Sequence, residues 1–437
     1  MNNGKSIRRA RLAGIALFLA SFGGLGCLPA ATFFYTFGTN EGGVASFTAT
    51  PDGQLTRHQT EPGTGLSKPR KLAVSDDQKR VLVVSEESPM GWIYRLDQPA
   101  DPLGLLEFDE PTTEAKALGD HALVMADKGF FYWFDLTSGQ IERKWNSRDG
   151  LTPPGHKGED ILFLPDKNLA MVSFQKDSKK GHKGSRLVLF DLATFTPKAD
   201  LQLPREYPSL NIPKSKKEQG PNPEMMFAAP KSNTLAVTLD LYGAIAFADL
   251  DAALNGEWKN LAYVPSSPDG KWGLSFPDRG TLLELGGKEY LLIANAAENG
   301  GLVLFDVEKR KIVQWFRAEA GAETPVYLPK AKKVVTVISG KMKQRTPDGL
   351  EKDTAPGKEL LVLDVAPLES GGKATFQRIP FPETVVKVEA IDPETSTVLL
   401  LVTGNNDLVT YDLAARKELA REPAKGPVNR MAVLRGK

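Results

Sequence analysis

Leu302-Val303-Leu304-Phe305-Asp306-Val307 is an apolar run that ends on an aspartate followed by one more aliphatic residue. The same pattern returns in residues 131–136 (FYWFDL), 187–192 (LVLFDL), 360–365 (LLVLDV) and 408–413 (LVTYDL), with looser copies at 93–97 and 245–250. The repeated aspartates are Asp97, Asp135, Asp191, Asp249, Asp306, Asp364 and Asp412. Because most copies lie roughly 40 to 60 residues apart, the chain is predicted to be an array of small supersecondary units.

The repeated aspartate has a simple role in such a unit. A short carboxylate at the end of a strand accepts a hydrogen bond from a backbone N–H two residues later and starts a tight turn. We therefore interpret these aspartates as turn residues. A set of catalytic or metal-binding carboxylates is the alternative.

Each unit contains four predicted strands. A leading strand comes first, as in residues 161–166 and 225–230, and a second strand follows, as in 169–174 and 234–239. The Asp-ended strand is third, and a polar strand such as 311–317 closes the unit. Four-stranded units that recur in this way are typical of a β-propeller.

The two ends of the chain complete this ring. Residues 426–434 look like a leading strand without followers, whereas residues 33–59 contain three strands without a leader. Joining them makes one composite blade and removes unpaired sheet edges. Seven internal units plus this composite predict an all-β, single, eight-bladed propeller closed by pairing of the N- and C-terminal strands. Seven blades is the alternative, because the unit at 114–147 is short and its leading strand is weak.

The amino-acid composition limits the partners and cofactors that the protein is expected to bind. Lys plus Arg number 55 and Asp plus Glu 54, so no overall charge selects nucleic acid or an anionic membrane. The one cysteine, Cys27, lies near the N-terminus, which argues against disulfides, cysteine-based zinc and cysteine-attached haem in the fold. The four histidines lack the spacing of metal ligands. We expect no metal and no cofactor.

The N-terminus has the order of a bacterial secretory signal. Lys5, Arg8, Arg9 and Arg11 precede an apolar run over residues 12–20, and small residues follow. Residues 1–31 are therefore predicted to be a secretory signal or lipoprotein leader, and residues 32–437 the propeller domain. Gly24-Leu25-Gly26-Cys27 resembles a lipobox, in which Cys27 would be lipidated; ordinary cleavage near Pro29-Ala30-Ala31 is the alternative.

Residues 69–77 (PRKLAVSDD) and 80–85 (RVLVVS) resemble the YVTN repeat, and 37–55 resemble the opening of bacterial lactonase-type propellers, the 6-phosphogluconolactonase family. The resemblance covers residues 35–97 and implies a propeller fold, seven-bladed in that family, and hydrolysis of a sugar lactone by His, Arg and Glu. Residues 222–225 (NPEM) and 240–243 (DLYG) occupy the comparable part of a blade here. They contain neither the histidine nor the arginine, so no catalytic residue is carried over.

Candidate ligand-binding residues lie at the start of the leading strands. These residues should converge at one mouth of the central channel, where propellers commonly bind ligands. They are Arg70, Glu159, Asp160, Glu224, Glu323, Lys387, Asn429 and Arg430. An arginine there would suit a carboxylate or a phosphate. The alternative is a solvated rim whose charges neutralise one another.

Two basic segments, residues 176–186 and 214–217, lack interleaved aromatic residues and are interpreted as solvated loops. Nucleic acid is therefore not an expected partner. The favoured function is an exported binding or scaffold protein of the periplasm or cell envelope, a monomer that takes a protein or a small polar ligand. It contacts the membrane only through a possible N-terminal lipid anchor. A lactonase-like hydrolase is the second hypothesis and a cofactor-dependent oxidoreductase the third.

Overall fold

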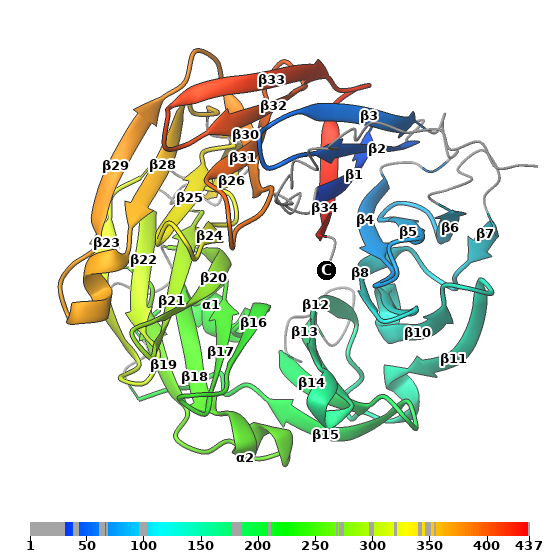
Figure 1. Ribbon diagram of the computed structural model, residues 1–437. Coiled ribbons are helices and arrows are strands. Elements are labelled where there is room, and N and C mark those ends of the chain that lie inside the picture. The colour runs from blue at the N-terminus through cyan, green and yellow to red at the C-terminus, as the bar shows by residue number, and fades with distance from the viewer. Residues whose placement is uncertain are drawn as a thin grey trace, which may run out of the picture.

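The chain folds into eight four-stranded antiparallel sheets that follow one another around a ring (Figure 1). The computed structural model describes residues 31–435 apart from 38–42, 61–65, 67–68, 96–102, 177–184, 209–210, 213, 268–269, 271–274, 297–300, 319–320, 340–342, 346–350 and 354. The fold is an eight-bladed β-propeller, so the eight-blade prediction is confirmed and the seven-blade alternative is wrong.

Blade 1 is the composite of the two chain ends. Its strands, from the inside outwards, are β34 (Val428–Arg435), β1 (Ala31–Phe37), β2 (Gly43–Ala49) and β3 (Leu55–Thr60). β34 pairs with β1 from Arg435 opposite Ala31 to Val428 opposite Phe37. This pairing confirms the predicted closure of the ring.

Blades 2 to 4 each use four consecutive strands. Blade 2 contains β4 (Pro69–Val74), β5 (Arg80–Ser85), β6 (Met90–Arg95) and β7 (Gly104–Glu107). Blade 3 contains β8 (Thr112–Leu118), β9 (His121–Ala126), β10 (Phe130–Asp135) and β11 (Gln140–Asn146). Blade 4 contains β12 (Lys157–Leu164), β13 (Leu169–Lys176), β14 (Arg186–Asp191) and β15 (Thr196–Gln202).

Blades 5 to 8 continue the ring. Blade 5 contains β16 (Pro223–Ala229), β17 (Thr234–Leu239), β18 (Ala244–Asp249) and β19 (Ala262–Pro265). Blade 6 contains β20 (Pro277–Leu285), β21 (Lys288–Asn295), β22 (Gly301–Asp306) and β23 (Lys311–Phe316). Blade 7 contains β24 (Val326–Leu328), β25 (Lys333–Val337), β28 (Glu359–Asp364) and β29 (Thr375–Pro380). Blade 8 contains β30 (Val385–Ala390), β31 (Val398–Thr403), β32 (Asp407–Asp412) and β33 (Lys417–Pro423).

Three smaller elements interrupt this pattern. A two-stranded hairpin, β26 (Lys343–Arg345) and β27 (Glu351–Asp353), is inserted between β25 and β28. Two short helices are α1 (Lys214–Gln219) and α2 (Leu250–Leu254). Among the described residues, no helix has the length and apolar character needed to span a bilayer.

The hydrophobic core is divided among the blade interfaces. Eight buried clusters each join one pair of neighbouring blades, and one of them packs Phe33 and Phe47 of blade 1 against Leu400 and Val402 of blade 8. The third strands carry much of this core. In β22, for example, every residue is buried. The apolar repeat therefore reflects burial on both faces of each sheet.

The turn interpretation of the repeated aspartates is confirmed at five positions. The Oδ1 atoms of Asp135, Asp191, Asp306, Asp364 and Asp412 each accept a hydrogen bond from a backbone N–H two or three residues later. Asp249 differs, because α2 follows it and its carboxylate binds Asn260 and Arg310 instead. Asp97 lies outside the described residues.

The prediction of two solvated basic loops is partly wrong. Arg186 lies on β14, is fully buried, and its Nη1 is 2.7 Å from Oδ2 of Asp200. Lys214 begins helix α1 instead of extending a loop. Residues 177–184 lie outside the described part of the chain, as do Cys27 and residues 1–30 of the predicted leader.

Candidate functional site

A β-bulge at the start of the leading strands positions the candidate site. The pairing register between a leading strand and its neighbour shifts at Pro69/Lys71, Thr112/Glu114, Pro223/Met226, Pro277/Arg279 and Val385/Lys387, and equivalent shifts occur in β12 and β34. A bulge inserts an extra residue, bends the strand and changes the direction of nearby side chains. Several charged side chains that line the channel lie at or beside these bulges.

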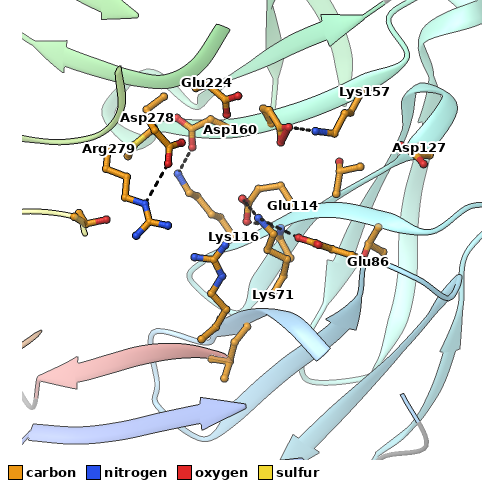
Figure 2. A pocket seen from close by; sticks show the side chains of 18 of the residues that line it. Lys71, Glu86, Glu114, Lys116, Asp127, Lys157, Asp160, Glu224, Asp278 and Arg279 are labelled. Atoms are coloured by element: carbon orange, nitrogen blue, oxygen red, sulfur yellow. Dashed lines mark hydrogen bonds and ion pairs between the residues drawn. The ribbon is translucent and has the colours of Figure 1, made fainter. Parts of the chain in front are cut away.

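Two adjacent cavities lie at this mouth of the channel. The larger, here called the channel cavity, has a volume of about 620 Å³ and is lined by residues of blades 1 to 7 (Figure 2). The smaller, of about 190 Å³, is lined by residues of blades 7, 8 and 1. Thr324, Arg430 and Met431 line both cavities, so the two cavities adjoin one another.

The structure brings most of the predicted site residues together. Glu159, Asp160, Glu224 and Arg430 line the channel cavity. Glu323, Lys387 and Arg430 line the smaller cavity. Whether they bind a ligand stays a prediction.

Two predicted residues are placed differently. Arg70 lies on β4 next to Lys71, and only its backbone is described. Asn429 lies on β34, is partly exposed and lines neither cavity.

Ion pairs link the leading strands of neighbouring blades. Lys71 Nζ of blade 2 is 2.7 Å from Oε2 of Glu114 in blade 3. Lys116 Nζ of blade 3 is 2.6 Å from Oδ1 of Asp160 in blade 4 and also donates a hydrogen bond to the carbonyl oxygen of Ile161. In both pairs the cation belongs to one blade and the carboxylate to the next. Figure 2 shows these contacts across the cavity wall.

Arg279 extends the same arrangement to blades 6 and 7. Its guanidinium forms an ion pair with Glu323 of blade 7, and its Nε is 3.3 Å from Oδ2 of Asp278. Burial lowers the pKa of Arg279, Asp278 opposes that effect, and nearby Arg430 adds to it. Arg279 therefore lies in a desolvated position where a further negative charge would be favourable.

Asp160 connects three leading strands. Besides its ion pair with Lys116 on β8, its Oδ2 accepts a 2.8 Å hydrogen bond from the backbone N–H of Met226 on β16. Burial raises the pKa of Asp160 even though Lys116 and Met226 act in the opposite direction. The carboxylate thus serves mainly to join β8, β12 and β16.

Glu224 is the most perturbed carboxyl group of the cavity. Its side chain lines the cavity and is half-buried, because it lies inside the ring. Burial holds its pKa well above the ordinary range, and the negative charges of Glu159, Asp240 and Asp278 add to this rise.

Two side-chain amides hold Glu224 in place. Gln175 Nε2 donates a 2.6 Å hydrogen bond to its Oε1, and Asn222 Nδ2 lies 3.5 Å from the same oxygen. Among the described residues, Oε2 of Glu224 has no hydrogen-bond partner.

Lys157 and Glu159 form an ion pair close to Glu224, and the pKa of the lysine is raised. Burial acts to lower the pKa of Lys157, but the Glu159 carboxylate beside it, together with Glu224 and Asp127, raises that pKa. Burial also raises the pKa of Glu159, against the influence of Lys157. The cavity therefore contains buried charges that depend on their partners.

The arrangement offers binding groups more clearly than catalytic ones. The described histidines, His58, His121 and His156, line neither cavity. His121 instead stacks on Trp133, and its Nε2 lies 3.2 Å from Oε2 of Glu142. Within the described ranges, no group of three potential metal ligands converges. No observation favours the lactonase hypothesis.

Sequence reasoning missed several cavity residues, namely Lys71, Glu86, Glu114, Lys116, Asp127, Lys157, Asp278 and Arg279. Two leading strands explain many of these omissions. β8 carries a mixed pattern of polar and apolar residues, and β20 has no clear apolar run, so the sequence does not predict β20 as a leading strand. The turn at Gly286-Gly287 before β21 was the available signal for β20.

Comparison with known proteins gives information on the fold alone. No protein-family model matches the chain, and no curated protein sequence matches it. Solved structures do match. The dihydro-haem d1 dehydrogenase NirN, solved in complex with DHE, is 14% identical, with a TM-score of 0.64 over 92% of this chain and 74% of its own.

Two further structures are of bacterial proteins. Apo AztD from Citrobacter koseri is 14% identical, with a TM-score of 0.57 over 94% of this chain and 99% of its own. BamB from Moraxella catarrhalis is 12% identical, with a TM-score of 0.53 over 84% of this chain and 92% of its own. At such low identity these similarities support the propeller fold and leave the ligand to be inferred from the cavity.

Proposed function

We propose that this protein is a binding propeller whose channel cavity holds a small polar ligand. The observation that supports this proposal is the cavity of about 620 Å³, which is lined by charged side chains from six of the eight blades. Ligand sites of small molecules commonly have volumes of about 300–1,000 Å³ and a few convergent polar groups. Asp160 and Arg279 are fixed by contacts with neighbouring strands, so the cavity is preorganised.

A ligand screen with matched variants tests this function. Sugars, lactones, phosphates, divalent ions and short peptides would be added to the purified protein, and the shift in melting temperature measured. Thr324 is exposed and lines both cavities, so Thr324→Trp should fill the mouth with little effect on the core. Thr137, exposed in the turn after β10, provides the control Thr137→Trp.

We expect a ligand to raise the melting temperature of the parent protein and of Thr137→Trp, but not of Thr324→Trp. A shift that persists in Thr324→Trp would place the ligand elsewhere. If no compound shifts the parent protein, binding of small polar ligands is contradicted, and a scaffold role towards a protein partner becomes the better hypothesis.

We also propose that the protein is exported to the periplasm or cell envelope as a monomer. The support is the basic and then apolar order of residues 1–31, together with the lipobox-like sequence ending at Cys27. Mass spectrometry of the chain recovered from a bacterial host would test the proposal. An intact Met1 on a cytosolic species would contradict export, whereas release of Cys27→Ala from membranes would support lipidation.

A further inference from the structure

Most charges that line the channel cavity are matched within the protein. The matched pairs are Lys71 with Glu114, Lys116 with Asp160, Lys157 with Glu159, and Arg279 with Asp278 and Glu323. Lys71 Nζ is also 4.0 Å from Oε1 of Glu86, and the charges of Glu224 and Asp127 both act on Lys157. Arg430 and Glu224 form no ion pair among the described residues, although the charge of Lys157 acts on Glu224 without such a contact.

Arg430 is a cation that has no counter-ion among the described residues. Within the described part of the chain, it has no hydrogen-bond or ion-pair partner. Its charge instead acts unfavourably on the buried Arg279. A free guanidinium presents a planar fork of N–H donors that fits a carboxylate or a phosphate in a bidentate manner. An anionic group placed between Arg430 and Arg279 would relieve their repulsion.

Glu224 lies on the other side of the channel. Arg430 belongs to blade 1 and Glu224 to blade 5, four blades apart in a ring of eight, so their leading strands β34 and β16 lie on opposite sides (Figure 1). Three further carboxylates, those of Glu159, Asp240 and Asp278, act on Glu224. Lys157 is the one cation that acts on Glu224 in the opposite direction. A further cation placed beside the unpartnered Oε2 would be favoured by all four carboxylates, which outnumber that lysine.

We propose that the channel cavity binds a zwitterion whose anionic group is held by Arg430 and whose cationic group is held by Glu224. This proposal rests on the proposed function and adds the class of ligand. Because the two side chains lie across the channel, the ligand's charges must be several atoms apart. A short peptide with free termini has this form, since an extended tripeptide spans roughly 10 Å.

The protonation of Glu224 provides an independent readout. Burial and neighbouring carboxylates hold the pKa of Glu224 well above its ordinary value in the empty cavity. An arriving ammonium group lowers that pKa, so any proton held by Glu224 is released to the buffer when the ligand binds. The heat of binding measured by calorimetry should therefore differ between buffers of different ionisation enthalpy.

The decisive experiment compares four forms of the same peptides. Mixed dipeptides and tripeptides would be prepared with free termini, as C-terminal amides, as N-acetyl peptides and with both ends blocked. Binding to the purified protein would be measured by calorimetry. We expect the free form to bind and each single block to weaken binding at least about 10-fold, because each removes one charge-assisted contact.

Two variants assign the ends of the ligand. Arg430→Gln should weaken the free peptides by the same factor as amidation and should have no further effect on the amides. Glu224→Gln should weaken the free peptides by the same factor as acetylation and should have no further effect on the N-acetyl peptides. It should also abolish the buffer-dependent heat. Arg430→Lys should recover part of the lost affinity. Lys198→Gln on β15 and Glu308→Gln after β22 remove exposed charges far from the cavity and serve as matched controls.

The outcomes separate this inference from the proposed function. Equal affinity for free and singly blocked peptides would overturn the zwitterion proposal, as would binding of only anionic or only cationic compounds, and in each case a small-ligand function would stand. The same holds if free peptides fail to bind while a sugar or phosphate does. If no compound of any class binds, both proposals are overturned.

Discussion

Glu224 shows how the position of one side chain determines its chemistry. The same carboxyl group on the outside of a blade would be solvated and ionised. Inside the ring it is half-buried beside Glu159, Asp240 and Asp278, and its pKa rises. Among the described residues only amide donors contact its Oε1, and Lys157 favours its ionised form without forming an ion pair with it. The ionised form is therefore costly in the empty protein.

This cost should be visible as a pH dependence of stability. A carboxyl group whose pKa is raised by folding favours the folded state most below its unfolded pKa, and that contribution is lost as the pH rises through the folded pKa. Glu224→Gln should therefore match the parent protein near pH 4 and become more stable than it towards pH 8. Each pKa unit corresponds to about 1.4 kcal/mol.

Thermal melts from pH 4 to pH 8 would measure the difference. For a chain of this size, 1 kcal/mol corresponds to about 2 °C or less in melting temperature. Glu308→Gln, which changes an exposed carboxylate, should show no such trend. A difference that narrows with rising pH would contradict the environment described for Glu224.

Asp412 illustrates the second residue-scale role, that of the turn. Its Oδ1 accepts hydrogen bonds from the backbone N–H groups of Ala414 and Ala415, at 2.8 and 3.2 Å, and from the hydroxyl of Thr397. Asp412→Ala should lower the free energy of unfolding by about 1–2 kcal/mol. Asp412→Asn, which keeps an acceptor oxygen, should cost less. Denaturant midpoints would measure both, and equal midpoints for all three proteins would exclude the turn role.

At the scale of elements, the strands were predictable and the bulges were not. Burial on both faces gives the third strands an apolar run, and the aspartate marks the turn, so both features are written locally in the chain. A bulge depends on the register between two strands and leaves no clear mark in composition. The sequence therefore predicted Glu159, Asp160, Glu224 and Arg430 at the cavity, but missed the cations paired across blades.

The leading strands are also connected to one another by these cavity residues. Asp160 on β12 binds Lys116 on β8 and the N–H of Met226 on β16. Asp160→Ala should remove both contacts and destabilise the protein by roughly 1–3 kcal/mol, because buried donors lose their acceptor. Hydrogen exchange of the Met226 amide should become faster.

A more conservative variant separates the two contacts. Asp160→Asn keeps an oxygen for the Met226 N–H but removes the charge opposite Lys116. Exchange at Met226 should then remain close to that of the parent protein, while stability falls by less than in Asp160→Ala. Unchanged exchange at Met226 in Asp160→Ala would show that β12 and β16 are held together by other contacts.

At the scale of the whole molecule, the ring distributes its core over eight interfaces, and each blade is held by two neighbours. No single sheet has a sufficient core of its own, so stability depends on closure. Closure was predictable, because an orphan leading strand at one chain end matches three followers at the other. The ligand was not predictable in this way, since it depends on which charges remain unmatched once all blades are in place.

Deletion of residues 426–437 tests this dependence directly. The truncation removes β34, exposes the inner edge of β1 and deletes the buried Val428 together with the partly buried Met431 and Val433. Burial of such side chains contributes up to about 1.5–3 kcal/mol each, against a typical total of ~5–15 kcal/mol. The truncated chain should melt far below the parent protein and self-associate through the exposed edge of β1.

A synthetic peptide covering residues 426–437 should reverse both effects, because it can add to that edge as the missing strand. Thermal melts and gel filtration, with and without the peptide, would measure the rescue, and a peptide of scrambled sequence provides the control. The same peptide carrying Arg430→Gln should restore stability but not ligand binding, since Arg430 faces the cavity while Val428 packs in the core. An unchanged melting temperature after truncation would mean that blade 8 and the remaining strands of blade 1 hold the ring closed without β34.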